Sequence, residues 1–106
     1  MKYDKLVRDK IHGRIKEKGA IPITHTADAA EYSRRLKEKL QEEVSEYLED
    51  ENLEELADIL EVIYAICKSR KIGRKKLEEA RKNKYAERGG FRDRTILEDI
   101  KEPGSL

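Results

Sequence analysis

The chain has 106 residues, of which 44% are charged and 6% aromatic, and its 24 Lys and Arg against 23 Asp and Glu leave a net charge of +1. A near-neutral balance argues against a dedicated DNA or RNA binder, which carries a basic face. No run of 18 apolar residues exists for a membrane span, and no signal peptide precedes the charged start. We therefore expect a cytoplasmic protein without nucleic-acid or membrane partners.

This length favours one domain over residues 1–106, with mobile ends at 1–4 and 101–106. Because Cys67 is the only cysteine, no internal disulfide can form, and we interpret it as a small core residue. His12 and His25 lack the spacing of a zinc site.

The first predicted helix runs from Lys5 to Lys18, with Asp4 as its cap and Gly19 at its end. Lys5, Arg8 and Lys10 lie beside its apolar edge. These cations either form a solvated face or contact a phosphate. A connector follows over residues 20–26, where Pro22 and β-branched residues favour an extended backbone.

A second helix is predicted from Ala29 to Glu49, because Asp28 and Glu31 form a capping-box pattern before a periodic apolar stripe. On a helical wheel, Glu43 falls inside that stripe and Glu46 at its margin, whereas Glu42 points further away. The stripe is Tyr32, Leu36, Leu40, Val44, Tyr47 and Leu48.

Asn52 begins a third predicted helix, Leu53 to Ser69, which is apolar around most of its circumference. Because one chain of four helices covers such a helix incompletely, we expect a homodimer through helices two and three. Glu55 and Asp58 stand in an apolar sector of this helix. Two structural alternatives stay open: Glu55 serves only at the helix start, or both acids pair with Arg or Lys from another helix.

A fourth helix is predicted from Arg74 to Arg88, with Leu77, Ala80 and Tyr85 inward and Gly89-Gly90 as its stop. The apolar residues after this stop are predicted to pack back onto the bundle. They are Phe91, Ile96, Leu97 and Ile100.

Two acidic pairs at i, i+3 spacing, Glu43/Glu46 and Glu55/Asp58, flank the break between helices two and three. Since a short turn makes such helices antiparallel neighbours, four carboxylates can converge there. Unpaired buried charges cost several kcal/mol each. Mg²⁺, with Mn²⁺ as an alternative, offsets this because it prefers hard oxygen ligands and leaves positions for water and phosphate.

The segments E42-E43-x-x-E46 and E55-x-x-D58 resemble the signature of the all-α nucleotide pyrophosphohydrolases, which include MazG, the dimeric dUTPase/dCTPase group and phosphoribosyl-ATP pyrophosphohydrolase. The opening K5-L-V-R-D-K-I11 and the late K84-Y-A-E-R-G-G-F91 look like a small, single-domain MazG-like branch. The linker between the acidic pairs, residues 47–54, is shorter than in many members, which leaves the base of the substrate the least transferable feature.

The resemblance implies an all-α, MazG-like bundle of about four helices, completed as a dimer or a dimer of dimers. It implies Mg²⁺-dependent cleavage of a nucleoside triphosphate or related nucleotide at the α–β phosphate bond, giving a monophosphate and pyrophosphate, as in the removal of non-standard nucleotides. The implied roles are metal binding for Glu43, Glu46, Glu55 and Asp58, water orientation for Glu42, catalytic phosphate contact for Lys84 and Arg88, and further phosphate contacts for Lys5, Arg8 and Lys10.

Three alternatives stay open. The first is phosphoribosyl-ATP hydrolysis at the same site. The second is a catalytically silent helical module for association or nucleotide sensing, in which the acids pair with cations. The third, nucleic-acid binding through the cations of the fourth helix, is opposed by the net charge.

Overall fold

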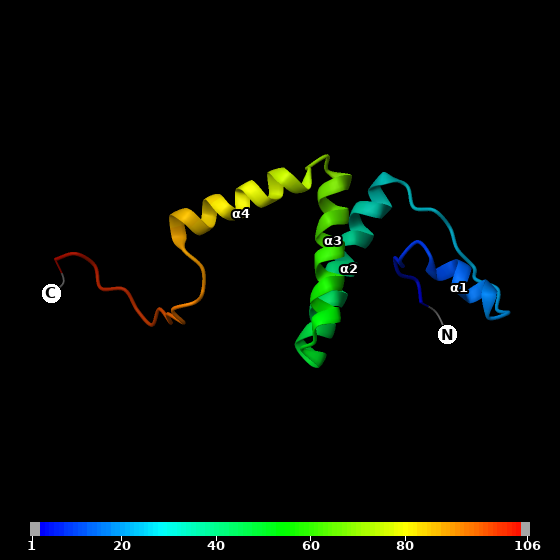
Figure 1. The fold of residues 1–106 in the computed structure, drawn as a ribbon, viewed down its shortest axis with the longest axis horizontal. Coiled ribbons are helices and arrows are strands. Elements are labelled where there is room, and N and C mark those ends of the chain that lie inside the picture. Colours follow the sequence, from blue (N-terminus) through cyan, green and yellow to red (C-terminus); the bar gives the residue numbers. More distant parts are fainter. Residues whose placement is uncertain (1–2, 105–106) are drawn as a thin grey trace. The chain divides into compact units, whose positions relative to one another are not determined.

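A computed structural model describes residues 3–104 of the chain, and within them all regular structure is helical. The four helices are α1 (Ile11–Glu17), α2 (Ala29–Asp50), α3 (Leu53–Ser69) and α4 (Arg74–Arg88) (Figure 1). The predicted all-α class is therefore confirmed. Among the described helices, none combines the length and the apolar character needed to cross a membrane.

Side-chain caps fix the starts of α2 and α3 where the sequence predicts them. The backbone N–H of Glu31 donates to Asp28 Oδ1 at 2.8 Å, and that of Glu55 donates to Asn52 Oδ1 at 3.0 Å. Between the helices, Glu51 adopts a left-handed conformation with φ 52°, and its N–H donates to the carbonyl of Tyr47 at 2.7 Å. The resulting turn is short, so α2 and α3 form an antiparallel hairpin.

The core of this hairpin is small. Leu36 of α2 and Val62 and Cys67 of α3 are its buried apolar side chains among the described residues. The burial of Cys67 agrees with its predicted role as a core residue. Several larger apolar side chains stay exposed on the same two helices, including Leu48 and Leu53 at 69% and 79%.

The first helix is shorter than predicted. It begins at Ile11 instead of Lys5, and Asp4 does not cap it, because Asp4 has φ 40° and binds elsewhere. Residues 5–10 form an irregular segment whose cations reach α2 and α3: Lys5 Nζ donates to Glu42 at 3.1 Å and Arg8 Nη2 to Asp58 at 2.6 Å. These long-range ion pairs hold the irregular segment against α2 and α3.

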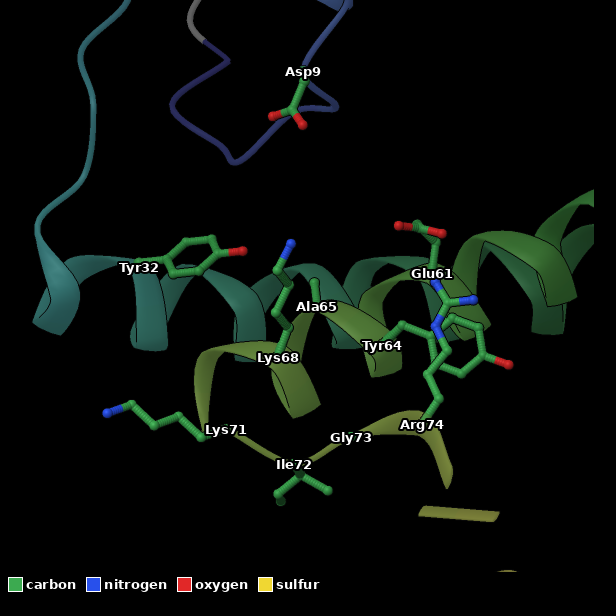
Figure 2. Close-up of a pocket in the computed structure, with 10 residues that line it drawn as sticks. All are labelled: Asp9, Tyr32, Glu61, Tyr64, Ala65, Lys68, Lys71, Ile72, Gly73 and Arg74. Atoms are coloured by element: carbon green, nitrogen blue, oxygen red, sulfur yellow. The ribbon is translucent and has the colours of Figure 1, made fainter. Parts of the chain in front are cut away.

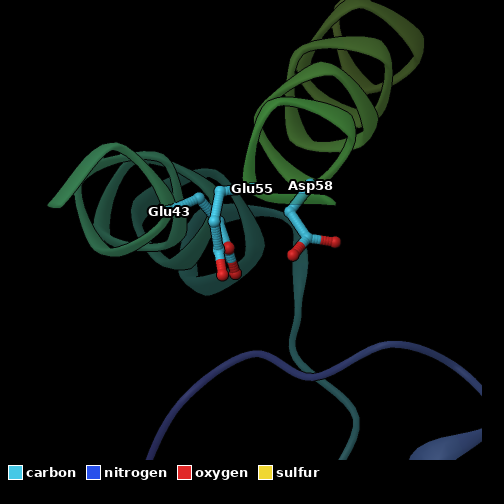
Figure 3. A group of neighbouring side chains, drawn as sticks. All are labelled: Glu43, Glu55 and Asp58. Atoms are coloured by element: carbon cyan, nitrogen blue, oxygen red, sulfur yellow. The ribbon is translucent and has the colours of Figure 1, made fainter. Parts of the chain in front are cut away.

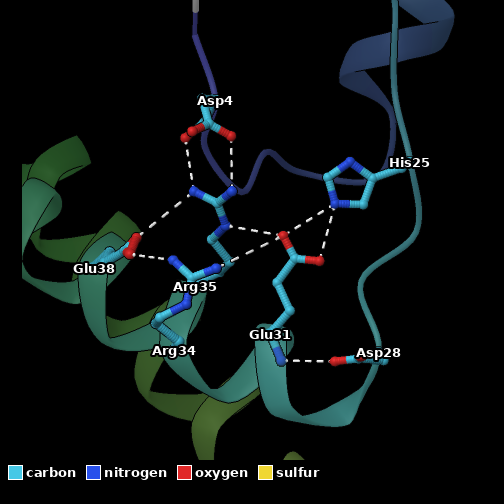
Figure 4. A network of polar contacts seen from close by, with 7 residues as sticks. All are labelled: Asp4, His25, Asp28, Glu31, Arg34, Arg35 and Glu38. Atoms are coloured by element: carbon cyan, nitrogen blue, oxygen red, sulfur yellow. Dashed lines mark hydrogen bonds and ion pairs between the residues drawn. The ribbon is translucent and has the colours of Figure 1, made fainter.

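A polar network holds the N-terminal segment and the connector against α2 (Figure 4). Arg35 donates to the backbone carbonyl of Asp4 at 2.9 Å and to its Oδ1 at 2.7 Å, and also to Glu31 at 3.3 Å. His25 Nε2 lies 3.0 Å from both oxygens of the same Glu31 carboxylate. The contact with His25, followed by that with Arg35, lowers the pKa of Glu31 despite the opposing effect of burial.

The chain divides into two compact units, one ending at Arg74 and one beginning at Lys75. In the second unit, α4 ends as predicted: Gly89 has φ 80° and its N–H donates to the carbonyl of Tyr85 at 2.7 Å. Of the positions predicted to face inward, Leu77 is half-buried, whereas Ala80 and Tyr85 are exposed.

The apolar side chains of the tail, from Phe91 to Ile100, are exposed, and they form no core within the second unit. Their packing onto the bundle, and the single domain over 1–106, stay predictions. The expected mobile ends include residues 1–2 and 105–106, which lie outside the described residues.

Candidate metal centre

Three carboxylates meet where α2 faces the start of α3 (Figure 3). They are Glu43 of α2 and Glu55 and Asp58 of α3, and one oxygen of each lies within 4.8 Å of the others. Asn52 starts α3 so that Glu55 falls in its first turn, and Asp58 follows one turn later on the same face. The short turn then brings both opposite Glu43.

The cluster contains buried oxygens without partners. The Glu43 side chain is one of the most enclosed in the described chain, with 6% of the residue exposed. Oε2 of Glu43 and Oε2 of Glu55 are both buried and accept no hydrogen bond. Buried polar atoms usually have a hydrogen-bond partner, so these two oxygens have free acceptor capacity for a ligand. Burial also raises the pKa of Glu43, an effect that the hydrogen bond from Lys39 offsets only in part.

Two cations border the cluster. Lys39 Nζ lies 3.2 Å from Glu43 Oε1, and Arg8 Nη2 lies 2.6 Å from Asp58 Oδ1. Of Glu55 and Asp58, for which the sequence left pairing to a cation of another helix open, Asp58 pairs with Arg8, which belongs to the irregular N-terminal segment. The pair of Glu43 with Lys39 lies within α2 itself. The sequence interpretation overlooked Lys39, although its position four residues before Glu43 places both on one face of α2.

Glu42 lies beside this cluster and shares the cation Lys39 with Glu43. Its carboxylate accepts hydrogen bonds from Lys5 at 3.1 Å and from Lys39 at 3.4 Å. Burial alone would raise the pKa of Glu42, but the hydrogen bond from Lys5 and the charge of Lys39 bring it below the usual value. The hydrogen bond to Glu42 in turn raises the pKa of Lys5.

The other predicted site residues lie outside the three-carboxylate group. Glu46, one turn after Glu43 on α2, is half-buried, and its charge contributes to raising the pKa of Glu43. Lys10 is exposed and precedes the first residue of α1. Lys84 and Arg88 are exposed one turn apart on α4, in the second unit.

The donor set of the cluster is chemically uniform. Three carboxylates with two unsatisfied oxygens suit a hard divalent cation such as Mg²⁺ or Mn²⁺, and they offer no nitrogen or sulfur for a softer metal. The cluster therefore fits the ion that the sequence predicts. In comparisons with protein-family models, curated proteins and solved structures, nothing matches this chain.

Proposed function

We propose that the chain is a Mg²⁺-dependent nucleotide pyrophosphohydrolase of the MazG-like kind, a cytoplasmic enzyme whose helical bundle is completed by dimerisation. It cleaves a nucleoside triphosphate or related nucleotide at the α–β bond, and its role is the removal of non-standard nucleotides. The observation that carries this proposal is the cluster of Glu43, Glu55 and Asp58, with two buried oxygens that lack partners.

In this proposal Glu43, Glu55 and Asp58 hold the ion, and Glu46 completes the set from the margin of the cluster. A divalent ion held by these residues would supply polarisation of a phosphoryl oxygen and activation of a water for attack. Glu42 orients that water as a carboxylate acceptor, and its position next to Glu43 on α2 supports the role. Phosphoribosyl-ATP is an alternative substrate for the same residues.

The cations then bind the phosphates. Lys5 and Arg8 stand beside the carboxylates through their contacts with Glu42 and Asp58, which supports phosphate binding by these two side chains. Lys10, Lys84 and Arg88 are assigned the same role on the sequence motifs alone. Lys84 and Arg88 share one face of α4, as a pair that grips a phosphate must.

Pyrophosphate release from a panel of standard and modified nucleotides, including phosphoribosyl-ATP, tests the proposal with and without Mg²⁺. We expect metal-dependent release that falls by at least a hundredfold in Glu55→Gln and Asp58→Asn, because each loses a charged ligand. Glu54→Gln is the matched control, since Glu54 is exposed and lies outside the cluster. Release that persists in both cluster variants, or is absent with every nucleotide, refutes the proposal.

A second candidate function rests on the ion pairs Arg8–Asp58 and Lys39–Glu43. They support a catalytically silent helical module in which cations of the chain itself neutralise the acids. That module predicts no stabilisation by Mg²⁺, whereas the enzyme predicts a rise in melting temperature that saturates with Mg²⁺ concentration. Thermal unfolding with and without EDTA separates the two.

A further inference from the structure

A pocket of about 550 Å³ is lined by residues of the N-terminal segment, of α2 and α3, and of the segment that follows α3 (Figure 2). This volume is in the range that ordinary small-molecule sites occupy. Besides Asp9, the aromatic and charged side chains that line it are two tyrosines, one carboxylate and three cations. They are Tyr32 of α2, Glu61, Tyr64 and Lys68 of α3, and Lys71 and Arg74 at the end of the first unit.

The pocket continues the same face of α3 that carries Asp58. Glu61 and Lys68 follow Asp58 by three and ten residues, which keeps them on one side of the helix, displaced along its axis by about 4.5 and 15 Å. Asp9, which also lines the pocket, directly follows the Arg8 that binds Asp58. The pocket therefore starts next to the carboxylates and extends toward the C-terminal end of α3.

The lining combines an aromatic surface with charged groups that have no partner among the described residues. The Arg74 guanidinium lies over the Tyr64 ring, 3.9 Å from its centroid, which holds this ring in place. Within residues 3–104, the side chains of Glu61, Lys68 and Lys71 make no hydrogen bond or ion pair, although opposite charges line one pocket. In Figure 2 Glu61 and Lys68 point to the same open side of α3, toward Asp9.

We infer that this pocket takes the nucleoside part of the substrate and selects bases by their carbonyl groups, an inference that rests on the proposed function. If the phosphates of the substrate lie at Asp58, the side chains that follow along α3 are placed to meet first the sugar and then the base. Glu61 accepts hydrogen bonds from sugar hydroxyls, the tyrosines contact the base, and Lys68 and Lys71 reach its far edge. Ammonium groups only donate, so they pair with carbonyl oxygens and not with amino groups.

The chain should thus favour guanine over adenine nucleotides and uracil over cytosine nucleotides. Calorimetric titration of the full-length chain in Mg²⁺ with GMP, AMP, UMP and CMP tests this without requiring hydrolysis. We expect GMP and UMP to bind about tenfold more tightly than AMP and CMP, because adenine and cytosine carry an amino group at C6 and C4, where guanine and uracil carry a carbonyl oxygen. Lys68→Gln should reduce each difference to less than threefold.

Arg70→Gln is the matched control, because Arg70 is an exposed cation two residues from Lys68 that does not line the pocket. It should keep the wild-type preference. Equal binding of GMP and AMP, tighter AMP binding, or an unchanged preference in Lys68→Gln overturns the inference. Hydrolysis without base preference overturns the inference and leaves the proposed function intact. Base-selective binding without hydrolysis of any nucleotide supports a base-binding pocket and refutes the proposed function.

Discussion

Glu43 is a carboxylate that is buried in an apolar environment. It lies in the apolar stripe of α2, it is nearly inaccessible to water, and one of its oxygens has no partner. Lys39 compensates only part of this, because the pKa of Glu43 is still raised by burial. An ionised carboxylate as buried as this one destabilises the fold unless a ligand or a cation neutralises its charge.

The first prediction concerns Glu43→Gln. A raised pKa in the folded state means that the wild type loses stability as pH rises from the ordinary glutamate value through the raised one. In EDTA, the glutamine variant should therefore be the more stable protein at pH 7, and the two should converge below pH 4. Urea unfolding at a series of pH values measures this. A wild type that is the more stable one at pH 7 contradicts it.

Magnesium should reverse the order of the two proteins. At Mg²⁺ concentrations a hundredfold above the dissociation constant, a site that binds only the folded state stabilises by about 2.7 kcal/mol. The wild type should gain this and Glu43→Gln should lose most of it. Similar gains in both proteins would remove Glu43 from the ligand set.

Arg8 carries a separate prediction at the residue scale, because it contacts a proposed ligand and is also assigned to phosphate. Arg8→Gln frees Asp58 from a competing cation, so Mg²⁺ affinity without nucleotide should stay equal or rise. The loss of a charged hydrogen bond to phosphate should raise KM about tenfold. Arg14→Gln, an exposed cation of α1, is the control. Weaker Mg²⁺ binding in Arg8→Gln would show that Arg8 positions the cluster instead.

At the scale of elements, the turn between α2 and α3 couples folding to the site. Asn52 caps α3 through the backbone N–H of Glu55, so the residue that starts the helix also fixes the position of Glu55, a proposed metal ligand. Asn52→Ala should cost about 1 kcal/mol of stability and weaken Mg²⁺ binding, whereas Asn52→Asp keeps the acceptor and both properties. Urea unfolding and Mg²⁺ titration of the three proteins check this. Equal stability and equal Mg²⁺ binding of the alanine and aspartate variants would show that the cap does not position the site.

The same elements explain what the sequence predicts well. The caps at Asp28 and Asn52 and the glycine after α4 are local signals, and the bounds of α2, α3 and α4 agree with them to within one residue. The inward position of Glu43 also follows from local periodicity, and its low exposure confirms it.

The features that the sequence analysis missed depend on contacts between residues far apart in the sequence. Residues 5–10 carry a helical pattern, yet the contacts Lys5–Glu42 and Arg8–Asp58 join residues 37 and 50 positions apart. The pocket also combines Tyr32, Tyr64 and Lys68 from segments that share no motif. Such pairings depend on how helices pack, which single-sequence periodicity does not contain.

At the scale of the whole molecule, the small core leaves many apolar side chains of the hairpin uncovered. Large apolar side chains near the turn of the α2–α3 hairpin stay half-buried or exposed in the single chain, which is more apolar surface than an isolated monomer favours. They are Val44 and Leu48 of α2 and Leu53, Leu56 and Leu60 of α3. This apolar face belongs to the same two helices that carry the carboxylates. Its burial in a homodimer would therefore also restrict the motion of those carboxylates.

Leu60→Glu tests the proposed dimer, because Leu60 lies two residues beyond Asp58, on a different side of α3. A charge there should shift the chain from dimer to monomer in sedimentation velocity, since a buried unpaired carboxylate costs several kcal/mol at an interface. The control is Ile23→Glu, an equally drastic change at an exposed isoleucine of the connector. If Leu60→Glu stays dimeric, the apolar face is not the interface. If it becomes monomeric but retains full Mg²⁺ binding, the site is complete within one chain, and dimerisation serves stability alone.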